Sequence, residues 1–353
     1  MSAPLAVAVV SPHAWPPGDD VAHHAAAEAR ALAARGHRVT LLAPASGRER
    51  LQAGRDLLRR AASGDAGAVT ADAGRLLEVA TGRALPAGAG RRLGGPLDLA
   101  QALEAALTAT PFDMVHLHEP LAPSPALAGL RHARGAVAAT FHRAEPLAGV
   151  AFLRPLVDRA LARVDLRIVT SAVARRALDE ILPGEYLLLP PGVDAVPAGA
   201  PEDPPALVVL ARARDRSGLR FGMALLRALD LDRFGRVVVV GPPEAPWRTR
   251  AAVPKALRDR VTALADPGPE ARLRALAGGA VAVVATPEEA AGPGLREAMA
   301  SGCAVLAPRG PAADELVRHG AEALILPPFS RDAWAAAATG LAGDPARRRA
   351  LAE

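Results

Sequence analysis

The chain has 353 residues, of which 50% are hydrophobic and only 3% aromatic, so its cores must be built mainly from Ala, Val and Leu. This length suits two domains of ordinary size, each able to bury its own core. The single cysteine, Cys303, excludes a disulfide framework and a thiolate metal cluster. No apolar run reaches the roughly 18 residues of a membrane span.

The formal net charge of +5 suits an anionic partner, such as a nucleotide-sugar or an anionic lipid surface. Lys255 is the one lysine among 42 basic residues, a bias typical of genomic composition, so arginine counts alone carry no functional signal. With one lysine, few aromatics and no recognition motif, no nucleic-acid partner is expected.

The start of the chain predicts an α/β unit. A continuous apolar run at 5–10 is typical of a strand buried on both faces of a parallel sheet. A helix is expected at 21–35, with Gly36 as its C-cap, and a second strand at 37–44. Because no basic residue or cleavage site accompanies the first apolar run, we interpret it as a strand and not as a signal peptide.

Residues 47–96 are rich in Gly, Ala and Arg. Two helical patches are expected there, at 51–62 and 73–80, and an exposed loop at 82–96. The arginines of this loop could contact an anionic lipid head group, but we expect them to be solvated; they are Arg83, Arg91 and Arg92.

Histidines mark the ends of two strands further along the chain. A strand at 114–118 ends in the string HLHEP, and a later one ends in ATFH, so the two ends carry His116, His118 and His142. The carboxyl ends of parallel strands are where α/β folds place ligands. We expect His116 to be a core histidine that points away from His118, whereas His118 and His142 are candidate site residues.

Strands and helices continue to alternate to the end of the chain. A strand at 166–170 leads to a helix that Ser171 is expected to cap. A segment at 195–205, rich in Pro and Ala, is the expected linker. The alternation after it predicts a second doubly wound parallel sheet. The predicted domains are therefore 1–194 and 206–353.

The most informative stretch is TPEEAAGPGLREAMASGCAVLAP, which runs from Thr286 to Pro308. A strand is expected to end near Ala285, followed by a glycine-rich loop around Gly292 and Gly294 and then by a helix. Backbone N–H groups at such a helix N-terminus bind anions, phosphates above all.

Two acids accompany this turn. Glu289 is expected in the loop and Glu297 about two turns along the helix, where both carboxylates could bind sugar or ribose hydroxyls. The alternative is that Glu289 caps the helix and that Glu297 is solvated. The whole ordered string favours the binding function over this alternative.

The string resembles the retaining glycosyltransferases of family four, whose hallmark is Glu-x7-Glu around a Phe-Gly loop, followed by a Glu-Ala-Met-Ala-x-Gly helix. Ala291 stands in place of the phenylalanine, and Pro293 removes a backbone donor from the loop. The resemblance implies the GT-B architecture, in which two Rossmann-like, doubly wound parallel-sheet domains face a cleft. The residues in register with the pattern are Glu289, Gly292, Glu297, Ala298, Met299, Ala300 and Gly302.

The first half of the chain is similar to the phosphatidylinositol mannosyltransferases and their near relatives. The shared features are the run HxHEPxAPS followed by ATFH, the opening VSPHAW and the phrase VTLLAPAS. In that subgroup the second histidine lies beside the donor sugar and the acceptor, which implies a catalytic role for His118. The acceptor contacts that the resemblance implies are His13, His142 and Arg143.

The family's paired glycines after the first strand approach the donor diphosphate, but this chain has Asp19 and Asp20 there. Aspartates bring bulk and negative charge toward a phosphate. A metal ion bridging them to a diphosphate would restore the site, yet we favour the simpler interpretation that the pair caps the following helix. No metal site is expected.

After the first strand of the second domain, the family carries an arginine and, six residues on, a lysine that together neutralise the diphosphate. Arg212 matches the arginine and is counted among the catalytic residues. The lysine position falls at Gly218 or Phe221, so Arg216 is the candidate substitute as a bidentate phosphate ligand. The other donor contacts that the resemblance implies are Glu297, Gly292, Gly294, Leu295 and Gly241.

The resemblance implies transfer of a sugar, with retention, from a nucleoside diphosphate to an acceptor hydroxyl, without a cofactor. The chemistry depends on a stabilised diphosphate leaving group, for which Arg212 and the helix N-terminus supply charge. Glu289 would hold the sugar and Glu297 the ribose. The subgroup implies GDP-mannose as the donor and a phosphatidylinositol-type lipid or a small molecule as the acceptor. It also implies a cytoplasmic protein in peripheral contact with the anionic inner face of the cell membrane.

The alternative is a catalytically inactive GT-B homologue that binds a nucleotide-sugar, a lipid or a protein partner. The departures at Asp19, Asp20, Ala291 and Pro293 and the missing lysine favour it, as does a chain that ends soon after a helix at 331–342, where relatives continue. The two glutamates, the strand-end histidine and the phosphate arginine are all present, and they favour the enzyme.

Overall fold

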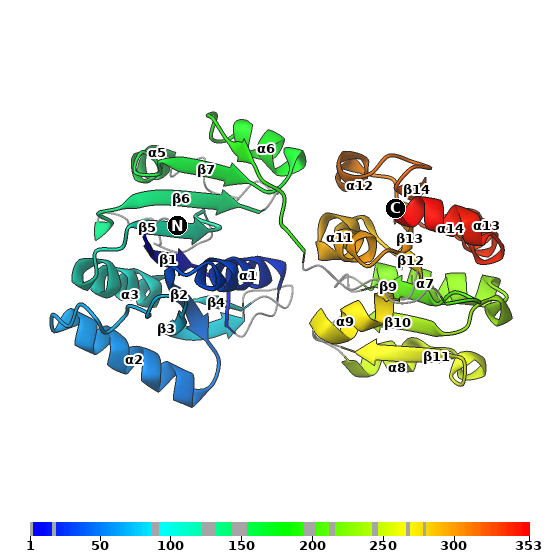
Figure 1. The fold of residues 1–353 in the computed structure, drawn as a ribbon, viewed down its shortest axis with the longest axis horizontal. Coiled ribbons are helices and arrows are strands. Elements are labelled where there is room, and N and C mark those ends of the chain that lie inside the picture. Colours follow the sequence, from blue (N-terminus) through cyan, green and yellow to red (C-terminus); the bar gives the residue numbers. More distant parts are fainter. Residues whose placement is uncertain are drawn as a thin grey trace. The chain divides into compact units, whose positions relative to one another are not determined.

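The computed structural model describes residues 3–15, 19–86, 92–121, 132–142, 154–193, 202–211, 216–241, 246–265, 269–277 and 280–353. The chain splits into two compact units, Met1–Pro191 and Gly192–Glu353. Each unit is a sheet of mostly parallel strands with helices packed on it (Figure 1).

The first unit is an eight-stranded sheet with the order β4-β3-β2-β1-β5-β6-β7-β8. Its strands are β1 (Ala6–Val10), β2 (Arg38–Ala45), β3 (Leu76–Pro86), β4 (Arg92–Gly94), β5 (Met114–His118), β6 (Ala136–Phe141), β7 (Leu166–Val169) and β8 (Leu187–Leu188). Its helices are α1 (Asp20–Ala34), α2 (Arg48–Ala62), α3 (Pro96–Ala109), α5 (Arg154–Leu161) and α6 (Ala172–Asp179).

The central strand β1 is buried over its whole length, because the two faces of the sheet are both covered. Val7 and Val9 face one side and belong to the cluster that includes the alanine face of α1. Ala8 and Val10 face the other side and pack with residues of α3. Asp113 aligns β1 with β5, since its carboxylate accepts the Ala6 N–H at 2.7 Å while its own N–H donates to the Ala6 carbonyl at 2.8 Å.

Two expectations for the segment after α2 were wrong. The patch at 73–80 is not helical, because β3 begins at Leu76 and pairs in parallel with β2. The expected loop at 82–96 is partly strand, since the end of β3 pairs antiparallel with β4. A short apolar run is compatible with either a helix or a strand. Here the hydrogen bonds that β2 makes with this segment favour the strand.

The expected caps are confirmed. Asp19 is the N-cap of α1, and its carboxylate accepts the Ala22 N–H at 3.0 Å. Ser171 is the N-cap of α6, and its hydroxyl accepts the Ala174 N–H at 3.0 Å. Both side chains replace a bond that the first turn of a helix cannot make for itself.

The second unit is a six-stranded parallel sheet with the order β11-β10-β9-β12-β13-β14. Its strands are β9 (Leu207–Leu210), β10 (Val237–Gly241), β11 (Val261–Ala265), β12 (Val281–Val284), β13 (Ala304–Pro308) and β14 (Ala323–Leu326). Its helices are α7 (Ser217–Ala228), α8 (Pro246–Ala252), α9 (Pro269–Leu276), α10 (Pro287–Ala291), α11 (Pro293–Ala300), α12 (Pro311–Leu316), α13 (Arg331–Gly343) and α14 (Pro345–Ala352). The short 3-10 helices are η2 (Leu231–Arg233) and η3 (Lys255–Leu257).

Both faces of this second sheet are buried as well. Leu207 and Val209 of β9 lie in one apolar cluster, and Val208 and Leu210 lie in the other. Cys303, just before β13, is buried as expected; its thiol donates to the Leu276 carbonyl, and burial raises the pKa of the thiol to about 12. It is therefore a core residue rather than a nucleophile.

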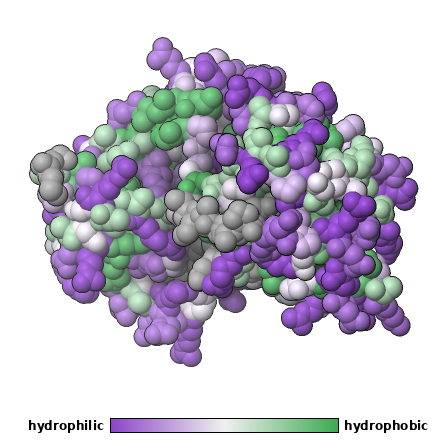
Figure 2. All heavy atoms as spheres, turned by 45° about the vertical axis from the view of Figure 1, so that its right-hand side comes forward, coloured by the Kyte–Doolittle hydropathy of each residue, from purple (hydrophilic) through white to green (hydrophobic). Residues whose placement is uncertain are grey.

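The face in Figure 2 shows a predominantly hydrophilic surface with separate hydrophobic areas. Within the described residues, no helix is both long enough and apolar enough to cross a membrane.

Trp334 of α13 anchors one core of the second unit. It is fully buried, its ring meets Phe221 edge-on at 5.2 Å, and its indole N–H donates to the Pro327 carbonyl at 2.8 Å. We expect Trp334→Ala to lower the free energy of unfolding by about 3–5 kcal/mol, because it leaves a cavity that the sheet cannot fill. Guanidinium denaturation followed by circular dichroism measures the change.

Trp247→Ala is the matched control for this prediction. Trp247 is 67% exposed, so its truncation should change the free energy of unfolding by less than about 0.5 kcal/mol. Equal losses in the two variants would contradict the assignment of Trp334 to the core.

Candidate functional site

A cluster of histidines lies at the carboxyl edge of the first sheet. His13 follows β1, His116 and His118 end β5, His142 follows β6, and His24 is on α1. The ring of His24 meets those of His118 and His142 edge-on, at 5.4 and 4.9 Å between centroids. The rings of His118 and His142 stack at 5.3 Å. The fold thus gathers five of the chain's nine histidines at one strand edge.

The expectation that His116 points away from His118 was wrong. Residues two apart on a strand share one face of the sheet, and the two rings stack with centroids 4.7 Å apart. His116 is nevertheless a satisfied core histidine, as expected. It is buried, its Nδ1 contacts the Glu28 carboxylate, and its Nε2 lies 2.7 Å from the Thr140 hydroxyl.

Glu28 was not identified from the sequence. It projects from α1, and one carboxylate oxygen bonds His116 while the other lies 3.2 Å from Nε2 of His118. The available signal was its spacing from His24, since residues four apart share a helix face and the buried residues of this helix are otherwise apolar. An acid on a buried helix face needs a partner on the element it packs against.

The charges in this cluster depend on burial. Burial by itself raises the pKa of the Glu28 carboxyl, but the hydrogen bonds from His116 and His118 and the charge of these rings hold the pKa well below its usual range. Burial lowers the pKa of His118 against the opposing effect of Glu28. Burial, with the neighbouring His118 and His24, holds the pKa of His142 well below its usual range.

His118 lies between two polar neighbours. Its Nε2 is 3.2 Å from a Glu28 carboxylate oxygen, and its Nδ1 is 3.0 Å from Nε2 of His142. Glu119 supports this arrangement: it is buried, adopts φ of 48°, and accepts the His142 backbone N–H at 2.7 Å. Glu119 stood in the HLHEP string, but its role depends on a backbone conformation that the sequence does not reveal.

Asp19 and His13 are engaged with each other. Nδ1 of His13 lies 2.6 Å from one Asp19 oxygen, while the other oxygen caps α1. His13 is itself buried. The Asp19 carboxylate is thus committed to the protein, which supports capping over a metal bridge to a diphosphate.

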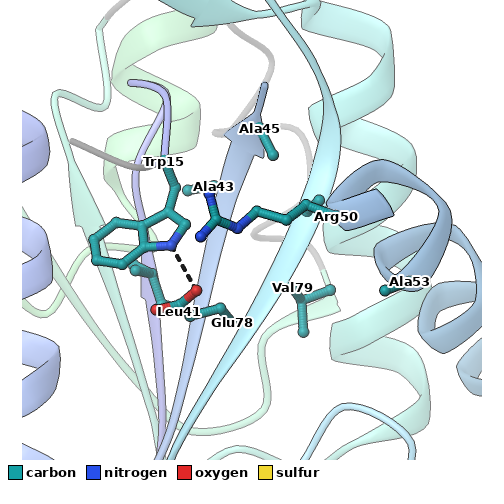
Figure 3. A pocket seen from close by; sticks show the side chains of 9 residues that line it. Trp15, Leu41, Ala43, Ala45, Arg50, Ala53, Glu78 and Val79 are labelled. Carbon is teal, nitrogen blue, oxygen red and sulfur yellow. Dashed lines mark hydrogen bonds between the residues drawn. The ribbon is translucent and has the colours of Figure 1, made fainter. Parts of the chain in front are cut away.

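A separate open hollow lies over β2 and β3 of the first unit (Figure 3). Trp15 donates its indole N–H to the Glu78 carboxylate at 2.5 Å, and Arg50 of α2 extends toward Trp15. The guanidinium carbon of Arg30 lies 5.3 Å from the centroid of the Trp15 ring. None of the site residues expected from the sequence lines this hollow.

The acidic motif of the second unit lies just past the end of β12. Thr286 caps α10, and its hydroxyl accepts the Glu289 N–H at 3.2 Å. Glu289 was expected in a loop, but it lies in α10 and is buried. The string Thr-Pro-Glu-Glu carries the start signals of a helix, namely a cap, a proline at N1 and acids in the first turn.

Gly292 separates α10 from α11 and caps the second helix. Pro293 occupies the first position of α11, where its missing N–H is one that has no partner within the helix. A Cβ on Gly294 would lie 2.3 Å from Oε1 of Glu289. The glycine therefore leaves the space in which the Glu289 carboxyl packs against the first turn of α11.

Glu297 is not solvated, contrary to the structural alternative. Its side chain is 10% exposed and forms a two-pronged ion pair with Arg272 of α9, with Nε 2.6 Å from Oε2 and an Nη on Oε1. Arg272, only 9% exposed, was not identified from the sequence. No local signal marks it among 42 basic residues, because only the packing of α9 on α11 brings the two together.

The other expected donor contacts have mixed placements. Leu295 is fully buried, so its side chain is core. Gly241 ends β10 where a Cβ would lie 1.8 Å from the Thr249 hydroxyl, so packing alone requires glycine there. Arg216 is exposed, with φ of 65° at the N-cap of α7. Arg212 and Arg143 lie outside the described residues.

The fold has solved counterparts. A glycosyltransferase from Rickettsia africae aligns with a TM-score of 0.68 at 12% identity, covering 98% of this chain and 91% of its own. Anabaena HepE, solved with UDP and glucose, aligns with a TM-score of 0.62 at 16% identity, covering 99% and 93%. At these identities the likeness shows the fold, which is the GT-B fold of glycosyltransferases, as expected.

The sequence comparisons define the family within this class. Residues 21–196 match the family model described as Glycosyltransferase Family 4, and residues 204–344 match the one described as Glycosyl transferases group 1. The two matches together cover most of the chain, which therefore belongs to the glycosyltransferase family that these models describe. The resemblance seen in its motifs is confirmed.

The curated relatives are phosphatidyl-myo-inositol mannosyltransferases. The protein of Propionibacterium freudenreichii is 31% identical over 174 residues, which cover 48% of this chain and 42% of that protein. The one of Mycolicibacterium smegmatis is 30% identical over 251 residues, 66% of this chain and 63% of that protein. The match spans less than two thirds of the length of either relative.

The pair of Glu297 and Arg272 yields a prediction on stability. Arg272→Met should lower the free energy of unfolding by about 3–5 kcal/mol, because it leaves a buried carboxylate without its counter-charge. The double variant Arg272→Met with Glu297→Leu should recover much of that loss. A double-mutant cycle in guanidinium measures the coupling. The exposed pair Arg318–Glu322 is the control, and solvent should screen most of its coupling.

Gly294→Ala and Gly340→Ala form a matched pair of helical substitutions. Gly294→Ala should lower the free energy of unfolding by about 1–3 kcal/mol, because its methyl group must displace the Glu289 carboxyl. Gly340 has open space around its Cα, so Gly340→Ala should raise stability by up to about 1 kcal/mol. Opposite signs in thermal denaturation support the packing role of Gly294, and equal effects would refute it.

Proposed function

We propose that the protein transfers a sugar, with retention, from a nucleoside diphosphate donor to an acceptor hydroxyl. The observation that carries the proposal is the burial of Glu289 against the first turn of α11, at the carboxyl edge of a parallel sheet. A carboxylate is a strong acceptor for sugar hydroxyls, and a helix N-terminus favours the negative charge of a phosphate. Because the Glu289 carboxylate and the N-terminus of α11 lie together, they suit a ligand in which a sugar is joined to a diphosphate.

The donor's other contacts follow from the same edge. Glu297 would accept hydrogen bonds from the ribose hydroxyls, since each of its oxygens has a further lone pair beside the bond to Arg272. Gly292, Gly294 and the backbone at Leu295 would approach the diphosphate. Arg212 and Arg216 would neutralise the leaving group, which is the main electrostatic requirement of the transfer.

His118 would face the anomeric centre, and His13, His142 and Arg143 the acceptor. The Glu28 carboxylate behind His118 suits a transition state in which positive charge develops on the sugar ring. No cofactor takes part in this scheme.

We propose GDP-mannose as the donor and a phosphatidylinositol-type lipid as the acceptor. Support comes from the relatives' shared name, phosphatidyl-myo-inositol mannosyltransferase. Anabaena HepE was solved with UDP-glucose, which supports a nucleotide-sugar donor for this fold but a different base. A lipid acceptor implies a cytoplasmic protein in peripheral contact with the inner face of the cell membrane.

Calorimetric titration with GDP and UDP tests the donor site. We expect micromolar binding of GDP and weaker binding of UDP. With GDP-mannose, Glu289→Gln should weaken binding by about 10- to 150-fold, the worth of one charge-assisted hydrogen bond. The control is Glu288→Gln, an exposed neighbour on the same helix, which should leave binding unchanged. Failure of both nucleotides to bind would overturn the donor site.

Transfer is measured with GDP-mannose and vesicles that contain phosphatidylinositol. We expect a mannosylated lipid whose anomeric configuration by NMR is that of the donor, and a loss of at least about 100-fold in kcat for His118→Ala. Inversion would refute the retaining mechanism. Tight nucleotide binding without transfer from any sugar nucleotide would identify a binding homologue instead.

A further inference from the structure

We propose that Glu28, His116 and His118 form a binding site for a divalent transition-metal ion, with Zn²⁺ the best match. Each residue offers one ligand atom, and the three atoms lie within 4.8 Å of one another. Two imidazole nitrogens and one carboxylate oxygen are a donor set that proteins use for Zn²⁺ and its first-row neighbours. The site shares Glu28 and His118 with the proposed sugar chemistry, which itself requires no metal, and it departs from the sequence expectation.

The spacing suits an ion at the centre of the three side chains. One Glu28 oxygen contacts Nδ1 of His116, and the other lies 3.2 Å from Nε2 of His118. Around a tetrahedral Zn²⁺ with bonds of about 2.0–2.2 Å, neighbouring ligand atoms are about 3.3–3.6 Å apart. Small rotations of the side chains therefore suffice to enclose the ion.

The second nitrogen of each imidazole is already held. Nε2 of His116 lies 2.7 Å from the Thr140 hydroxyl, and Nδ1 of His118 lies 3.0 Å from Nε2 of His142. Histidines that bind metals almost always have such a partner on the other ring nitrogen, which fixes the ring and its tautomer. Both rings thus present their remaining nitrogen to the same carboxylate.

The ligands lie on a helix and a strand, α1 and β5, and not on loops. His116 pairs with Val9 across the sheet, and Val9 packs in the cluster that contains the alanine face of α1. Glu28 lies on that helix, so the carboxylate is directed at β5. Ligands on a helix and a strand keep their geometry better than ligands on loops.

Access and coordination number are consistent with a bound ion. The two histidines are buried, whereas the Glu28 side chain is 21% exposed, which gives solvent a way in. Three protein ligands leave a fourth tetrahedral position for water, the pattern of sites that are open to a further oxygen ligand. The competing explanation is a hydrogen-bonded Glu–His–His network that needs no ion.

Cobalt titration of the full chain decides between these explanations. After treatment with a chelator and dialysis, Co²⁺ is added and the visible absorption bands of the bound ion are followed. We expect one ion per chain, with the intense bands of four-coordinate Co²⁺, and stoichiometric displacement by Zn²⁺. An increase in Tm with Zn²⁺ is expected in parallel, because the ion binds the folded state.

Variants identify the ligands. Glu28→Gln and His118→Asn should each weaken Co²⁺ binding by more than about 100-fold, and Thr140→Val, which loses only the supporting bond, by about 10-fold. The control is His23→Asn on the same helix, because Nδ1 of His23 bonds the Asp19 carbonyl and lies outside the proposed ligand set. That variant should bind like the wild type.

The wild-type titration keeps the proposal testable even if a variant fails to fold. Absence of stoichiometric binding, a six-coordinate spectrum, or binding lost in His23→Asn and kept in Glu28→Gln would each overturn the site. None of these readouts depends on sugar transfer, so the metal site and the proposed function can fail independently.

Discussion

Both sheets have apolar side chains packed on two faces, and this constraint determines where polar chemistry can lie. Along β1 and β9 every side chain is buried, so a charged group within either strand would lose its hydration on both sides. Polar side chains therefore collect where strands end. The histidines follow or end β1, β5 and β6, and the acidic motif follows β12. These are the edges at which parallel α/β sheets bind ligands.

An acid with little solvent exposure lies at each edge, and each acid has a partner from an element distant in sequence. Glu28 meets two histidines of β5, and Glu297 meets Arg272 of α9. A buried carboxylate without such a partner would cost several kcal/mol, whereas a paired one contributes little net stability. The pairs are better understood as positioning devices, since they hold a charge and its orientation in a site with little water.

The structure accommodates the departures from the family pattern better than the sequence motifs suggested. Pro293 lies in the first turn of α11, where the missing N–H costs no hydrogen bond within the helix. Asp19 caps α1 and bonds His13, so its carboxylate is held by the protein where the family has glycine. These placements support the proposal of an enzyme, in which Arg216 would take the place of the family's phosphate lysine.

The sequence by itself determined the fold class, the α/β alternation, the helix caps at Asp19 and Ser171 and the family. These features are local, because continuous apolar runs, cap residues and an ordered motif are all read from neighbouring positions. The tertiary structure alone decided that β3 is a strand, since its ladder belongs to β2. It also decided the partners Glu28 and Arg272, each of which depends on a helix packing against an element far away in the chain. The spacing of residues along the chain carries no information about such contacts. For this reason the sequence could not identify Glu28 and Arg272, the charged partners of the predicted His118 and Glu297.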